Sequence, residues 1–237
     1  MKFNALFSIY LLFFIIPSSA QTFKAKYMQV TRLSNAPDSV TATLIFNTEA
    51  SNYRYRLPIA PQADIKSQAK ELAYHRELKS GRMLNREYLF DAPVLVSDTV
   101  PEITWTISYD APVRIISNLS CRKAEGNFRG RQYIAWFSEQ YPTKAGPWKL
   151  AGLPGLIIEA EDSDGAVKYS LLSIVNTGDK VTVPDAPIEV SQALYVQGIR
   201  NKLNALNYSI SSEDADISIQ TTSSIKLNVL ERSLFEN

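Results

Sequence analysis

The sequence has few of the residues that most often build catalytic and metal sites. Its 237 residues include one histidine, His75, and one cysteine, Cys121. A zinc ion needs three or four ligands, usually histidines and cysteines, so the standard zinc ligand sets are excluded. A single thiol cannot form an internal disulfide, and the domain must be stable through burial alone. We therefore expect no metal and no cofactor.

The sequence also lacks an excess of charge of either sign. It contains 25 basic and 24 acidic residues, which gives a net charge of +1. A nucleic-acid partner would require a basic face to neutralise its phosphates. The balance argues against such a partner. After residue 20, no apolar run is long enough to span a bilayer, so we expect no membrane span in the mature chain.

The first 20 residues have the order of a secretory signal peptide. Lys2 precedes an apolar run over residues 5–16, Pro17 interrupts it, and Ser18-Ser19-Ala20 supplies the small residues of a cleavage site. An uncleaved N-terminal anchor is the alternative. We expect an exported protein, periplasmic or envelope-associated, whose mature chain starts at Gln21. Because no cysteine follows the cleavage site, a lipid anchor is not expected. Residues 21–237 suit a single domain.

Alternation of apolar and polar residues dominates the mature chain and predicts half-buried antiparallel strands. Two further segments, Arg131–Phe137 and Leu156–Ala160, are apolar on both faces and should lie in the middle of a sheet. The alternating segments are 40–46, 53–57, 103–109, 167–171, 217–219 and 225–229.

Two segments have helical spacing of apolar residues. Residues 62–80 carry Ile65, Ala69 and Leu72, and Gly81 follows as a stop signal. Residues 188–206 form the second predicted helix. The fold class expected is therefore α+β, mainly β, with an antiparallel sheet and two helices.

One loop stands out because glycine is scarce elsewhere. Five of the nine glycines lie between Gly126 and Gly155, and three prolines accompany them. Pro154 pre-sets φ for a turn, and Gly155 can take the positive φ of a type II turn. The apolar side chains between the glycines predict a turn with buried side chains that leads into the strand at Leu156.

The segment from Gly152 to Ile157 spells GLPGLI, and the sequence resembles the GLPGLI family of exported bacterial envelope proteins. The resemblance covers roughly residues 103–161 in order and spacing. It implies a strongly curved, half-barrel-like sheet, and it implies little chemistry. The motif residues, for which we expect a structural role, are Trp105, Cys121, Gly130, Arg131, Trp136, Gly146, Pro147, Trp148, Gly152, Leu153, Pro154, Gly155, Leu156 and Ile157.

No catalytic constellation is apparent in the sequence, and we expect no catalytic residues. His75 follows Glu71 by four residues and is expected on the polar surface of the first helix. Cys121 has basic neighbours that could activate it, but a free cysteine is usually buried, and we expect it to be unreactive.

A cluster of carboxylates follows the hexapeptide. Such a cluster could serve acid–base chemistry or bind calcium. Asp162-Ser-Asp164-Gly165 also has the Asp-Gly signal of a hairpin turn, and this is the interpretation we favour. The cluster consists of Glu159, Glu161, Asp162 and Asp164.

The three tryptophans Trp105, Trp136 and Trp148 either fill the core or line a concave apolar pocket. The core is the favoured interpretation. The leading functional hypothesis is a non-catalytic binding or accessory module for an apolar ligand, a peptide or an envelope transporter. The alternatives are a carboxylate-dependent hydrolase and a structural envelope protein. The oligomeric state does not follow from the sequence.

Overall fold

The computed structural model describes residues 21–33, 38–57, 69–89, 91–100 and 102–213. The predicted signal peptide, residues 1–20, lies outside these ranges. So do the strands predicted at 217–219 and 225–229.

The described residues form thirteen strands and one helix. The strands are β1 (Phe23–Thr31), β2 (Asp38–Phe46), β3 (Ala50–Arg56), β4 (Glu71–Glu77), β5 (Arg82–Leu89), β6 (Ala92–Thr99), β7 (Trp105–Ile107), β8 (Arg114–Ile116), β9 (Leu119–Phe128), β10 (Arg131–Ser138), β11 (Leu156–Asp162), β12 (Val167–Asn176) and β13 (Glu189–Ser191). The helix is α1 (Gln192–Glu213).

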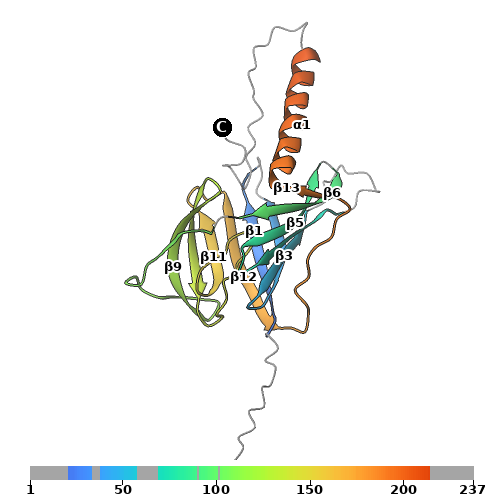
Figure 1. Ribbon diagram of the computed structural model, residues 1–237. Helices are drawn as coiled ribbons and strands as arrows, with labels where there is room; N and C mark the ends of the chain where they lie inside the picture. Colours follow the sequence, from blue (N-terminus) through green and yellow to red (C-terminus); the bar gives the residue numbers. More distant parts are fainter. Residues whose placement is uncertain (1–20, 34–37, 58–68, 90, 101, 214–237) are drawn as a thin grey trace, which may run out of the picture.

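The strands make one large open, curved sheet. Its order is β13-β6-β5-β4-β3-β2-β1-β12-β11-β10-β9-β7, with β8 paired to β9 beside this path. All neighbours are antiparallel except β13 and β6, which run parallel. Figure 1 shows β9 to β11 curving away from the strands around β3 and β5. The predicted mainly-β class and curved antiparallel sheet are confirmed.

Alternating burial along the strands explains why the sheet has an inner, core-facing side. In β1, Ala25, Tyr27 and Gln29 are buried, whereas the residues between them are more exposed. The two segments predicted to lie mid-sheet do so: β10 lies between β9 and β11, and β11 between β10 and β12. Their central position follows from the apolar residues on both faces, but only the inner face of β10 is fully buried, because Ile134 and Trp136 on its other face are half-buried.

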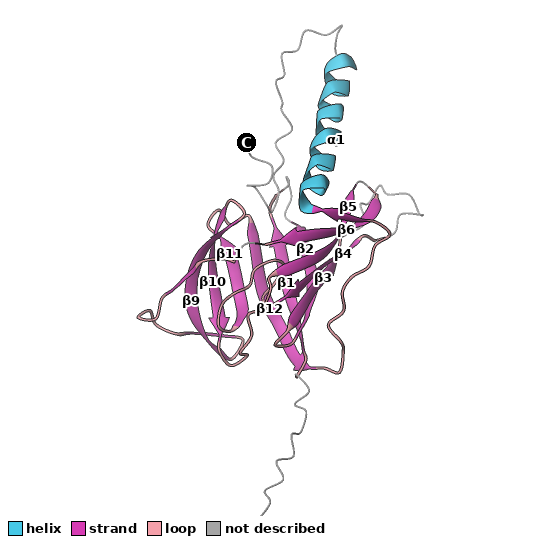
Figure 2. Ribbon diagram, in the orientation of Figure 1, coloured by secondary structure: helices cyan, strands magenta, loops and turns pink. Residues whose placement is uncertain are grey.

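The second predicted helix is present as α1, although Glu189–Ser191, predicted near its start, form β13 instead. The helix projects from the end of the sheet near β6 (Figure 2). The first predicted helix is wrong in its described part, because residues 71–77 form β4 between β3 and β5. Both faces of β4 are buried, from Leu72 to Arg76. Of the three residues with helical spacing, only Leu72 lies in β4, so that spacing did not describe this strand. Gly81, predicted to end the helix, has φ +73° in the turn to β5.

Candidate functional site

The loop between β10 and β11, residues 139–155, enters the core of the protein. Its side chains Trp148, Leu150 and Leu153 are at most 4% exposed and belong to the main hydrophobic cluster. The indole nitrogen Nε1 of Trp105, on β7, donates a hydrogen bond to the carbonyl of Ala151 at 2.9 Å. The loop therefore fills the inner face of the sheet.

The backbone of this loop is unusual at two positions. Gly152 has φ +104°, which favours glycine, and Trp148 has φ +53°. A bulky residue in the left-handed region costs on the order of 1–3 kcal/mol, so the surrounding contacts must hold it there. The aromatic ring of Trp148 contacts that of Phe128 edge to face, with 5.7 Å between the ring centroids.

Gly155 departs from the sequence-based prediction. Its φ is not positive. Glycine is needed here because neighbouring backbone atoms leave no room for a side chain. A Cβ at this position would clash with the carbonyl oxygen of Ser138 and would lie 2.6 Å from its carbonyl carbon. Gly146 is similarly confined, because a Cβ there would lie 2.5 Å from the carbonyl oxygen of Leu150. Close backbone approach is thus the physical reason for glycine at both motif positions.

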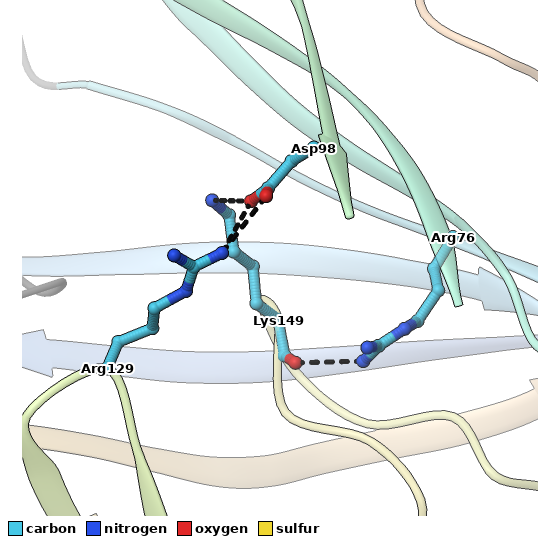
Figure 3. Close-up of polar contacts among 4 residues, drawn as sticks. All are labelled: Arg76, Asp98, Arg129 and Lys149. Carbon is cyan, nitrogen blue, oxygen red and sulfur yellow. Dashed lines mark hydrogen bonds and ion pairs between the residues drawn. The ribbon is translucent and has the colours of Figure 1, made fainter. Parts of the chain in front are cut away.

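A buried ionic cluster, shown in Figure 3, surrounds Lys149 of the loop. The Lys149 ammonium lies 3.3 Å from a carboxylate oxygen of Asp98, on β6. Arg129, in the turn between β9 and β10, contacts the same carboxylate at 3.0 Å. Arg76, on β4, donates from Nη1 to the Lys149 carbonyl at 3.0 Å. The side chains of Asp98 and Lys149 are 3% and 2% exposed.

This cluster joins parts of the sheet that are not neighbours. β6 lies next to one end of the strand order, whereas the Arg129 turn belongs to β9 and β10 near the other end. Asp98 therefore holds two cations that come from the far half of the sheet and from the loop. Because buried charges are stable only when they are paired, this carboxylate is a central contact of the inner face.

Gly130 and Arg131 have structural roles. Arg129 and Gly130 both have positive φ, +49° and +80°, in the two-residue turn between β9 and β10. Positive φ at both central positions is the geometry of a type I′ hairpin. Arg131 pairs with Asp162 at 2.6 Å, and both side chains are 1% exposed. The other oxygen of Asp162 accepts a hydrogen bond from the Val167 amide at 2.8 Å.

The other three carboxylates that follow the hexapeptide in the sequence do not converge on Asp162. Glu159 and Glu161 project from the outer side of β11, and Asp164 is exposed in the turn between β11 and β12. The amide of Gly165 donates to the Asp162 carbonyl at 3.0 Å in that turn. The hairpin predicted here is present, because β11 and β12 are antiparallel neighbours.

Cys121 and His75 are both buried. Cys121 is 0% exposed, as expected, and burial raises the pKa of its thiol to about 11. The prediction for His75 is wrong: it lies on β4 and is 6% exposed, not on a helix surface. Burial lowers its pKa below the ordinary value. The segment at Thr182 crosses this face, where the side-chain amide of Asn52 donates to the Thr182 carbonyl.

The outer face of β10, β11 and β12 carries a groove of about 490 Å³. Half-buried Trp136 lies opposite Glu159 across the strand pair, and Ile134 lies opposite Glu161. The guanidinium of Arg114, on β8, lies 5.4 Å from the Trp136 ring centroid and 3.6 Å from the Glu159 carboxylate. We call this surface the Trp136 groove; Lys168 completes it.

The three tryptophans therefore differ in position. Trp148 is buried in the core, and half-buried Trp105 and Trp136 both pack against it, as the favoured interpretation predicts; Trp105 is also bonded to the loop, and Trp136 also lines the outer groove. Among the residues that the structure describes, no group of three or more histidine, cysteine or acidic side chains is placed to hold a metal ion. No helix within those ranges is long and apolar enough to cross a membrane.

Residues 105–159 match a protein family described as "Protein of unknown function (Porph_ging)". This stretch coincides with the block that carries the motif residues. No curated protein matches the chain.

The fold resembles part of a larger protein, PNGF-II. Two crystal forms of PNGF-II, C2 and P21, match with a TM-score of 0.56 and with 15% and 16% sequence identity. The match covers 76% of this chain and 33% of the PNGF-II chain, so the protein spans about one third of that length. A lipoprotein-sorting protein domain from Vibrio parahaemolyticus matches with a TM-score of 0.34 and 6% identity over 67% of this chain and 87% of that one, too weakly to support an argument.

Proposed function

We propose that the protein is an exported envelope protein of the GLPGLI type that binds a polypeptide partner through the Trp136 groove and catalyses no reaction. The observation that carries this proposal is Trp136 itself. It lies half-buried on the outer face of the sheet, beneath an arginine and in a groove of about 490 Å³.

The chemistry of the groove suits a polypeptide. Tryptophan and arginine are the residues most enriched at the energetic centres of protein interfaces, where large apolar area and directed hydrogen bonds combine. Glu159 and Glu161 are each held by a cation, Arg114 at 3.6 Å and Lys168 at 3.2 Å. These ion pairs form a polar rim around the apolar Trp136 and Ile134. An entirely apolar ligand would leave the rim charges desolvated.

The inner face offers less room, because the loop of residues 139–155 packs there. This supports a binding surface on the outside of the sheet. The likeness to one third of PNGF-II supports a module, since the same fold recurs there within a longer chain.

Site-specific photo-crosslinking in the native envelope tests the proposal. A photoreactive residue at Ser163, exposed and lining the groove, should give a discrete protein adduct. The same residue at Leu194, which is 59% exposed on α1, is the matched control and should give none. The Ser163 adduct should disappear in Arg114→Ala, whose side chain is 54% exposed and lies over the Trp136 ring. Crosslinks to lipid alone would instead indicate an apolar ligand.

The proposed location has a separate test. N-terminal sequencing of protein from the envelope fraction should start at Gln21. An intact Met1 terminus on the envelope protein would overturn export by cleavage after Ala20.

A further inference from the structure

A second cavity lies beside the ionic cluster, on the inner side of the sheet and away from the Trp136 groove. It encloses about 170 Å³. Its walls come from the turn between β4 and β5, the segment after β6 and the loop of residues 139–155. The charged side chains that line it are Arg76, Lys79, Lys144 and Glu102. Three cations therefore face one carboxylate.

The proposal for this cavity depends mainly on the buried side chain of Arg76. It is 7% exposed, and among the described residues its guanidinium forms one hydrogen bond, to the Lys149 carbonyl at 3.0 Å. It forms no ion pair within 4.0 Å there, because Asp98 is already bonded to Lys149 and Arg129. Burial lowers the pKa of Arg76, although Asp98 and Glu102 oppose this effect from a distance.

A buried guanidinium without a carboxylate partner has an unmet requirement for negative charge. Its planar array of N–H groups matches the two oxygens of a carboxylate or phosphate. Lys79 and Lys144, both exposed at the rim, add positive charge at the entrance. Lys144 pairs only loosely with Glu102, at 3.7 Å, and the Glu102 side chain is 79% exposed.

We propose that this cavity binds a small oxyanion, a carboxylate or a phosphate group, with Arg76 as its principal partner and Lys79 and Lys144 at its rim. The site is independent of the Trp136 groove, so either proposal can fail without the other. It places an anion next to the loop that carries the family motif, where binding would stabilise the loop against the sheet.

Isothermal titration of the purified full chain with inorganic phosphate and, separately, succinate tests the proposal at constant ionic strength. We expect saturable binding of at least one, with a Kd no weaker than about 10 mM, equivalent to roughly 2.7 kcal/mol. The anion whose binding saturates, phosphate or succinate, identifies the kind of oxyanion that the cavity binds. Removal of both rim charges by Lys79→Gln and Lys144→Gln should weaken binding about fivefold to tenfold, since solvent screens exposed charges. Lys180→Gln, at an exposed lysine outside the cavity, should leave the Kd unchanged.

Two further variants separate binding from folding. Glu102→Gln removes the one opposing carboxylate of the cavity and should tighten binding, an effect that a structural role would not produce. Arg76→Gln should abolish binding; circular dichroism shows whether this variant folds. The proposal would be overturned if neither anion bound with a Kd of about 10 mM or tighter, or if the Kd were unchanged in both the double lysine variant and Glu102→Gln.

Discussion

The substitution Gly155→Ala adds one methyl group where the structure has no room for it. The new Cβ would clash with the Ser138 carbonyl oxygen and would lie 2.6 Å from its carbonyl carbon and 2.8 Å from the Glu139 amide nitrogen. These are backbone atoms at the end of β10, so no side-chain rotation can relieve the contact. The loop or the strand must move, and both belong to the core.

The expected cost follows from this geometry. Overpacking a well-packed core typically costs 1–3 kcal/mol, and a contact with backbone belongs at the upper end, so we expect about 3 kcal/mol. For a domain of this size, that loss lowers Tm by about 6–12 °C. Gly155→Val should cost more. Binding of the polypeptide partner per folded molecule should be retained, because the Trp136 groove is on the outer face of the sheet and Gly155 is in the loop on the inner face.

The assay is a thermal melt and a urea titration of Gly155→Ala beside Gly178→Ala. Gly178 has no positive φ and no atom within 4 Å of the position that a Cβ would take, so its substitution should be close to neutral. If both variants melt at the temperature of the wild type, close packing does not explain glycine at position 155.

Three other predictions concern buried groups. Asp98→Asn removes the carboxylate charge that both Lys149 and Arg129 contact and should lower the unfolding free energy by about 3–5 kcal/mol, measured in urea; an unchanged midpoint would show that the cluster is not structural. Because the pKa of His75 is lower in the folded state, the unfolded chain binds more protons as pH falls below about 6.5, so stability should decline there and the decline should be smaller in His75→Gln. With its pKa raised to about 11, the Cys121 thiol should react with a bulky thiol reagent only after denaturation, and rapid labelling of native protein would contradict its burial.

The sequence predicts the strands better than the site because strand patterning is local. Alternation along β2 and β12 reflects one covered face, and it can be counted without knowledge of the partner strands. β4 is different, since Leu72 to Arg76 are buried on both faces. The structure of β4 depends on its pairing with β3 and β5 and on the segment at Thr182 that covers it. Neither contact can be inferred from the residues of β4 alone.

The ionic cluster could not have been predicted for the same reason. Asp98 is 31 positions from Arg129 and 51 positions from Lys149 in the sequence. The three residues together do not form a sequence motif. Only the curvature of the sheet brings them together. The lysine in Gly-Pro-Trp-Lys did offer a signal, because a charged residue among buried apolar neighbours requires a partner.

The most direct test of the proposed function is the affinity of the protein for the polypeptide captured from Ser163. Truncation of an aromatic anchor at the centre of an interface costs about 2–4 kcal/mol, so Trp136→Ala should raise the Kd by roughly 30- to 1000-fold. Arg114→Ala should raise it as well, and Leu194→Ala, on α1, should not. Equal Kd values for the wild type and a folded Trp136→Ala variant would contradict the assignment of the Trp136 groove as the binding surface.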